Sequence, residues 1–156
     1  MPQKQKKRPS TPTSKALKAG YRSGLEEITA EQIKVGGLEV SYEEDVIGFE
    51  WPSRKAKYHP DFKLPKDGGF FYVETKGRWV TQDRHKILLV LAQHPDLDLR
   101  MVFSNANAKL YKGSPTSYAM YCDKHGIRWA NKRIPDEWLQ ESKDAITRER
   151  GAIHRT

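Results

Sequence analysis

The sequence predicts an α/β fold in which a mixed β-sheet is flanked by helices. Residues 69–76 (GFFYVETK) and 97–105 (LDLRMVFSN) have the apolar composition of strands, and the segment between them carries apolar residues at helical spacing, namely Ile87, Leu88, Val90 and Leu91. Strand, helix and strand in this order predict a parallel pair with a right-handed crossover. A short strand at 61–64 and the turn PKDGG at 65–69 add an antiparallel neighbour, which makes the sheet mixed.

The N-terminal elements begin with a helix. Ser23 and Glu26 have the S-x-x-E spacing of a capping box, Gly36 and Gly37 end the helix, and its apolar stripe consists of Leu25, Ile28 and Ile33. The following alternation predicts a half-buried strand through Leu38, Val40 and Tyr42. Residues 52–57 are expected to form a basic connector.

The remaining elements lie around and after the βαβ unit. Thr81 or Asp83 is expected to cap the helix between the two strands. Ser114 and Pro115 mark the start of another helix, and Gly126 lies just past its end. The last elements are a short edge strand at 127–130 (IRWA) and a helix at 134–150.

The charge of the chain favours a polyanionic partner. The formal net charge is +8 and the pI about 9.5, and binding to DNA releases counterions from a dense array of phosphates. Residues 1–19 contain no acid and six basic residues, Lys4, Lys6, Lys7, Arg8, Lys15 and Lys18. This segment is expected to be a flexible basic arm that reaches for phosphates, although an inert solubilising tail is an alternative.

Composition excludes several other classes. No segment approaches the ~20 apolar residues of a membrane span, and the basic N-terminus lacks the apolar stretch of a secretory signal. One cysteine, Cys122, rules out an internal disulfide framework and a multi-cysteine zinc site, and it is expected to pack in a helix in a reducing, cytoplasmic compartment. The predicted organisation is the arm at 1–19, one domain at 20–140 and a basic tail at 141–156.

The residues best suited to chemistry lie on the hairpin. Side chains two apart on a strand point to one face, about 6.6 Å apart, so Glu74 and Lys76 project together while Thr75 faces the other way. The hairpin brings Asp61 beside Glu74. Two carboxylates offer hard oxygen ligands to Mg²⁺, the Thr75 carbonyl can complete its coordination, and Lys76 can orient a water or stabilise charge on the phosphorane oxygens. The alternative is a solvated Glu74–Lys76 ion pair on a strand face.

A family resemblance narrows these alternatives. PD followed by ETK matches the PD-(D/E)xK nuclease signature, and further motifs occur in a fixed order: RSGLE (22–26), PDF…LP (60–65), VETKG (73–77), QHPDLD (93–98), KLYKGSPTSY (109–118), KHGI (124–127) and IP.EW (134–138). Over roughly residues 19–140 this set closely resembles the phage endonuclease I family, which resolves Holliday junctions.

The resemblance implies a fold, a site and a partner. It implies a restriction-endonuclease-like core in a domain-swapped homodimer that makes paired cuts in branched DNA during recombination, in the cytoplasm of an infected host cell. The catalytic residues would be Asp61, Glu74, Lys76 and Glu26, with Glu26 supplied by the other chain. Asp61, Glu74, Glu26 and the Thr75 carbonyl would bind Mg²⁺ or Mn²⁺, two ions per site, with no small-molecule cofactor.

Two parts of this assignment have simpler structural alternatives. Glu26 could instead only close the capping box with Ser23. The inter-subunit bridge would lie at about 45–57. Candidate DNA contacts, each of which could also be an ordinary surface charge, are Arg22, Arg54, Lys55, Lys57, Arg78, Arg84, Lys109 and Lys112.

Three functions remain in competition. The first is a junction-resolving endonuclease. The second is a PD-(D/E)xK nuclease that cuts linear duplex DNA. The third is a non-catalytic DNA-binding protein that keeps the fold.

Overall fold

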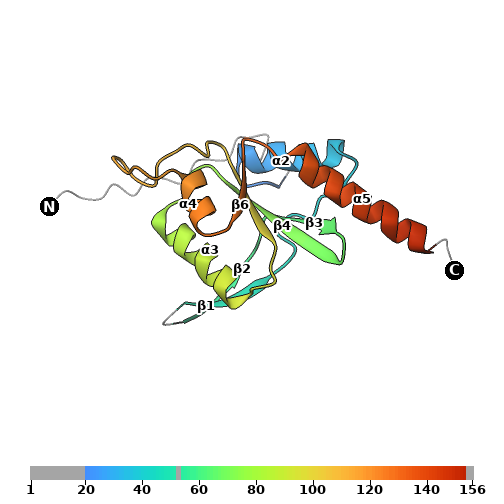
Figure 1. The fold of residues 1–156 in the computed structure, drawn as a ribbon, viewed down its shortest axis with the longest axis horizontal. Coiled ribbons are helices and arrows are strands. Elements are labelled where there is room, and N and C mark those ends of the chain that lie inside the picture. The colour runs from blue at the N-terminus through green and yellow to red at the C-terminus, as the bar shows by residue number, and fades with distance from the viewer. Residues whose placement is uncertain (1–19, 52–53, 154–156) are drawn as a thin grey trace.

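The computed structural model describes residues 20–51 and 54–153, so the predicted basic arm at 1–19 lies outside the described residues. Its centre is a four-stranded sheet in the order β3–β4–β5–β6 (Figure 1). The strands are β3 (Phe62–Lys66), β4 (Gly69–Lys76), β5 (Leu99–Phe103) and β6 (Arg128–Asn131). β3 pairs antiparallel with β4, whereas β4–β5 and β5–β6 are parallel. The predicted mixed sheet, hairpin and edge strand are therefore confirmed.

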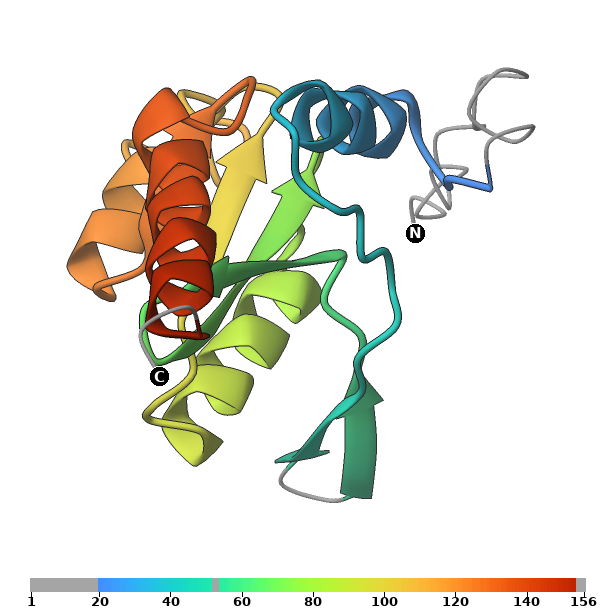
Figure 2. The same cartoon turned by 90° about the vertical axis from the view of Figure 1, so that its right-hand side faces the viewer.

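Helices cover both faces of this sheet (Figures 1 and 2). α3 (Thr81–Gln93) and α4 (Tyr118–Lys124) pack on one face, where Cys122 is fully buried as predicted. α2 (Gly24–Val35) and α5 (Asp136–Ile153) pack on the other, around Ile33 and Trp138. α5 runs past residue 140, where the sequence placed a domain boundary. Within the described residues, no helix is long and apolar enough to cross a membrane.

The segment before the hairpin differs from the prediction. Residues 38–42 form no strand, because only Tyr42 makes an isolated bridge, to Phe62. The alternating apolar residues reflect burial without strand pairing, since Leu38 packs in the core. The backbone then bends at Glu43, which has a φ of 50°. The predicted connector at 52–57 is also wrong in part. Residues 54–58 form a strand there, β2 (Arg54–Tyr58), which pairs antiparallel with β1 (Ile47–Trp51).

Three details of the helices also differ from the prediction. Ile28 of α2 is 63% exposed, because Thr29, Ala30 and Ile33 form the buried face. α3 has Val80 at its N-cap without a side-chain hydrogen bond, so neither Thr81 nor Asp83 caps it. α4 begins after Ser117, whose hydroxyl accepts from Met120, because Ser114 and Pro115 lie in the preceding turn.

Candidate active site

A cleft of about 580 Å³ opens at the end of β4, where the chain leaves the sheet for α3. It gathers side chains from five separate segments of the chain. The lining residues are Arg22, Glu26, Glu43, Tyr58, His59, Asp61, Glu74, Thr75, Lys76, Asp83, Lys86 and Ile87. The four side chains predicted from the sequence to be catalytic all lie in this one cleft.

Asp61 lies just before β3 and is 5% exposed. Its Oδ2 accepts two hydrogen bonds from Thr75, one from the backbone N–H at 2.9 Å and one from the hydroxyl at 2.8 Å. Burial raises the pKa of Asp61 to about 6, and the bonds from Thr75 only partly offset it. Thr75 therefore fixes the orientation of this carboxyl, a role that the sequence did not reveal.

Glu74 lies on β4 and is also buried. Burial raises its pKa well above the usual range, and the nearby charge of Asp61 raises the pKa further. The hydroxyl of buried Tyr58 donates a hydrogen bond to Glu74 Oε2. The sequence did not point to Tyr58 as a site residue, because it directly follows the predicted basic connector at 52–57.

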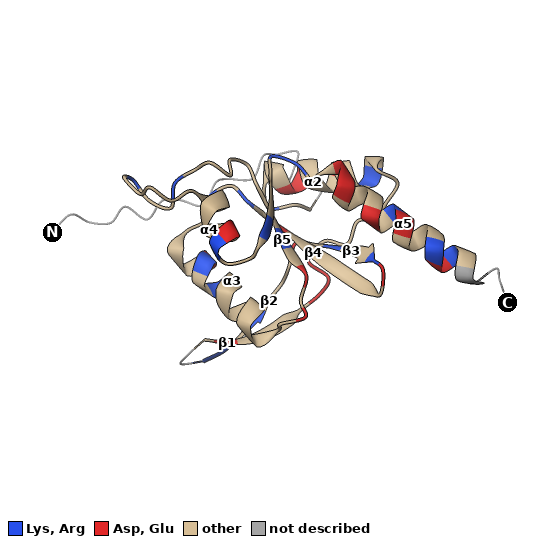
Figure 3. Ribbon diagram, viewed as in Figure 1, with Lys and Arg blue, Asp and Glu red and all other residues tan. Residues whose placement is uncertain are grey.

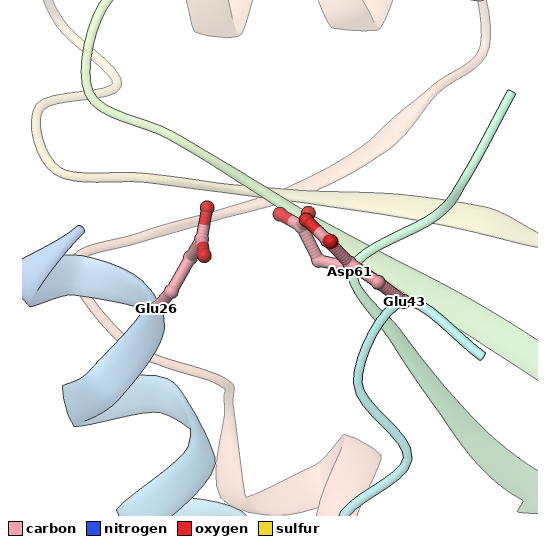
Figure 4. Close-up of side chains that lie close together, drawn as sticks. All are labelled: Glu26, Glu43 and Asp61. Atoms are coloured by element: carbon pink, nitrogen blue, oxygen red, sulfur yellow. The ribbon is translucent and has the colours of Figure 1, made fainter. Parts of the chain in front are cut away.

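The geometry of Glu26 is compatible with both roles that the sequence left open. Ser23 Oγ accepts from the Glu26 N–H at 3.1 Å, which is the predicted N-cap. The carboxylate of Glu26 accepts from the Arg22 N–H at 3.1 Å and from the Tyr42 hydroxyl. A capping box would have it accept from the N–H of Ser23, which is one residue later. In this geometry the same carboxylate also faces the cleft (Figure 4).

Three carboxylates approach one another in the cleft. Oxygens of Glu26, Glu43 and Asp61 all lie within 4.8 Å of one another, with Glu26 reaching across from α2 and Glu43 lying beside Asp61 (Figure 4). Glu43 is held there because its N–H donates to the Asp61 carbonyl at 2.8 Å. The acidic run EED at 43–45 was the only sequence signal for Glu43, and nothing in its spacing pointed to this site.

Lys76 lines the cleft and forms an ion pair with Asp83 of α3 at 3.7 Å. Within the described part of the chain, no ion pair joins Lys76 to Glu74. The isolated surface salt bridge considered from the sequence is therefore not formed.

The chemistry of these donors fits a hard divalent cation. Glu26, Asp61 and Glu74 supply only oxygen atoms, which Mg²⁺ and Mn²⁺ prefer, and no thiol lines the cleft. Burial of Asp61 and Glu74 disfavours their ionised forms, and a bound cation offsets that cost. Carboxyl groups with raised pKa values in a cleft are typical of functional sites.

The predicted DNA contacts divide into two groups. Arg84 is 6% exposed, and its guanidinium donates to the Trp79 carbonyl at 2.6 Å and to Thr81 Oγ1 at 3.1 Å. It is thus a structural residue, a role that the sequence prediction did not give it. The other seven are exposed: Arg54, Lys55 and Lys57 lie on β2, and Arg22, Arg78, Lys109 and Lys112 lie between elements. Figure 3 shows basic residues spread over helices, strands and loops of the ribbon.

The fold and the cleft together define an α/β protein with a carboxylate-rich candidate active site. The phage endonuclease I family matches residues 10–154, and the chain belongs to this family. Endonuclease I of Escherichia phage T7 is 48% identical over 126 residues, which cover 81% of this chain and 83% of that protein. Endodeoxyribonuclease 1 of Enterobacteria phage T3 is 45% identical over 126 residues, 81% of each chain.

Proposed function

We propose that this protein is a DNA endonuclease that resolves four-way and other branched junctions by metal-dependent phosphodiester hydrolysis. The observation that carries the proposal is the convergence of Glu26, Asp61, Glu74 and Lys76 in one cleft. The names of the two phage relatives support the DNA endonuclease activity. Branched DNA as the substrate rests on the family resemblance of the sequence motifs, and so does the restriction-endonuclease-like core.

Each side chain has a distinct role in the proposed reaction. Glu26, Asp61, Glu74 and the Thr75 carbonyl hold the Mg²⁺ or Mn²⁺ ions, two per site. When bound, such ions polarise the phosphoryl oxygen and lower the pKa of a coordinated water. Lys76 orients the attacking water or stabilises negative charge that develops on the phosphoryl oxygens.

Further contacts keep these groups in place. The N–H and hydroxyl of Thr75 hold Asp61, and the hydroxyl of Tyr58 holds Glu74. The bonds from Arg22 and Tyr42 hold Glu26. Because each carboxylate is already oriented, little reorganisation is needed when substrate binds.

The proposed enzyme is a two-fold homodimer. A four-way junction has paired strands to cut, and a dimer with two equivalent sites suits paired cuts. Residues 45–57, which contain most of the β1–β2 hairpin, are the proposed bridge between subunits. The exposed basic residues bind phosphates, so shape rather than base sequence selects the substrate.

The substrate is tested with an end-labelled four-way junction and a linear duplex of matched sequence. Both are incubated with the protein in Mg²⁺ and in EDTA. We expect symmetric cuts in the junction that require Mg²⁺, with the duplex spared. Equal cutting of both substrates would move the function to a duplex nuclease, and binding without any cutting would leave a DNA-binding protein.

The role of Glu74 is tested by Glu74→Ala. Because the carboxylate holds metal while the basic surface holds DNA, we expect cleavage to fall by on the order of 10³-fold or more with junction binding in Ca²⁺ retained. Gel-shift titration and single-turnover cleavage measure the two effects. Glu137→Ala, at an exposed position of α5 outside the cleft, is the matched control. Loss of binding together with activity would make Glu74 a structural residue.

A further inference from the structure

The charges in the cleft do not all pair with one another. Two of its cations are engaged, because Arg22 pairs with Glu43 at 3.3 Å and Lys76 pairs with Asp83 at 3.7 Å. Lys86 of α3 also lines the cleft, yet among residues 20–51 and 54–153 it has no ion-pair partner. An ammonium without a carboxylate partner, in a carboxylate-lined cleft, is available to a ligand.

The position of Lys86 is set by an aromatic contact. Its Nζ lies over the ring of Tyr58, 5.1 Å from the centroid, and the Tyr58 hydroxyl in turn holds Glu74. The charge of Lys86 is near enough to Glu74 to lower the pKa of that carboxyl, against the larger opposing effects of burial and of Asp61. Lys86 therefore lies on α3 beside the groups proposed to bind metal.

The ammonium of Lys86 is not needed to neutralise the carboxylates once the proposed metal ions are bound. With Arg22 and Lys76 paired, the remaining carboxylates are Glu26, Asp61 and Glu74, which are the proposed metal ligands. Divalent ions neutralise this set, and Lys86 is then a surplus positive charge next to it. A lysine acts toward phosphate as a point charge on a flexible stem, which suits this position.

We propose that Lys86 binds a non-bridging oxygen of a backbone phosphate of the strand to be cut, at or next to the scissile phosphodiester. This assignment rests on the proposed function and adds a substrate-binding residue to it. Lys86 thereby positions the strand against Glu74, whereas Lys76 is paired with Asp83.

The test pairs one side chain with one phosphate. Junctions carry a single neutral methylphosphonate at the scissile position or at either neighbour, and their affinity for wild type and Lys86→Gln is measured in Ca²⁺. We expect Lys86→Gln to weaken binding of the unmodified junction by roughly 5- to 10-fold. One methylphosphonate should weaken wild type similarly but weaken Lys86→Gln by less than about 2-fold. Lys86→Arg should bind the unmodified junction as wild type does and should lose affinity to the same extent when a methylphosphonate is present.

Lys143→Gln is the matched control, since Lys143 is an exposed lysine of α5 outside the cleft. Circular dichroism melting of each variant shows that it is folded. Equal methylphosphonate losses for wild type and Lys86→Gln at all three positions would overturn the assignment. Failure of wild type to cut the unmodified junction in Mg²⁺ would instead overturn the proposed function, so the two failures are distinguishable.

Discussion

At the scale of single residues, the burial of two carboxyl groups in the cleft lowers the stability of the fold. Asp61 is buried with a pKa near 6, and Glu74 is buried with its pKa raised strongly. Neither carboxyl forms an ion pair within the described residues. Such groups destabilise the metal-free fold at neutral pH and favour the binding of a cation.

Asp61→Asn should therefore stabilise the protein in EDTA at pH 7. The native carboxyl keeps its proton up to about pH 6, whereas the unfolded chain loses it near 3.8, so the free energy of unfolding of wild type falls as pH rises between these values. The cost at pH 7 is at most about 3 kcal/mol. We expect the variant to raise Tm by roughly 2–6 °C at pH 7 and hardly at all below pH 4.

The melting curves are measured from pH 4 to pH 7, with and without Mn²⁺. Mn²⁺ should raise the Tm of wild type much more than that of Asp61→Asn. Asp96→Asn, at an exposed loop position, is the control. It should change neither the pH dependence of Tm nor the rise in Tm caused by Mn²⁺. A Tm difference that does not depend on pH would show that ionisation of Asp61 is not the cause.

At the scale of elements, the most regular segments were the most predictable. β4 and β5 were predicted correctly because each is a short apolar run, and α3 because its apolar residues have helical spacing. Strand geometry then places Glu74 and Lys76 on one face of β4. The β1–β2 hairpin was missed because its position depends on tertiary contacts. The side-chain amide of Gln93 in α3 accepts from the Glu50 N–H at 2.6 Å and donates to the Glu50 carbonyl at 2.7 Å.

The same distinction applies to the candidate site. Asp61, Glu74 and Lys76 could be grouped from strand spacing alone, since neighbouring strands of a hairpin have a defined register. Glu43, Tyr58 and Lys86 come from a loop, the hairpin and a helix, and only packing brings them to the cleft. Sequence period carries no information about such contacts.

The link between β4 and α3 makes a second prediction possible. α3 lacks a side-chain N-cap, and Arg84 holds its start by donating to the Trp79 carbonyl. Arg84→Ala leaves that buried carbonyl without this donor, and we expect a loss of about 2–4 kcal/mol in the free energy of unfolding in urea. Junction affinity of the folded variant should be unchanged.

Arg78→Ala gives the matched contrast, because Arg78 is exposed in the same connection. It should leave the free energy of unfolding within about 0.5 kcal/mol and weaken junction binding. If Arg84→Ala lowered affinity while stability stayed the same, Arg84 would be a DNA contact after all.

At the scale of the whole molecule, the chain that supplies Glu26 distinguishes a swapped from an unswapped form of the proposed dimer. In the single chain described here, Glu26 approaches Asp61 of the same chain (Figure 4). In the proposed swapped dimer, the equivalent contact joins two chains, and every local contact of the cleft can be kept. Residues 45–57, the proposed bridge, then connect the two halves of the dimer instead of closing one chain on itself.

Mixed dimers distinguish these two arrangements. Under the proposed function, Glu26→Gln and Glu74→Ala chains are each expected to be inactive. If the two chains pair at random on refolding together in equal amounts, about half of the dimers are mixed. In a swapped mixed dimer, one site receives intact Glu26 from the second chain and intact Asp61 and Glu74 from the first. We therefore expect co-refolding to restore cleavage, as single nicks in the junction and not as paired cuts.

Asp61→Ala refolded with Glu74→Ala is the control for this complementation. Both changes lie in the part of the chain that follows the proposed bridge, so each site of their mixed dimer is defective with or without a swap, and this mixture should stay inactive. Cleavage is followed on a supercoiled cruciform plasmid, in which nicked and linear products separate. Absence of nicking in the Glu26→Gln and Glu74→Ala mixture, with mixed dimers present by mass spectrometry, would mean that each chain completes its own site.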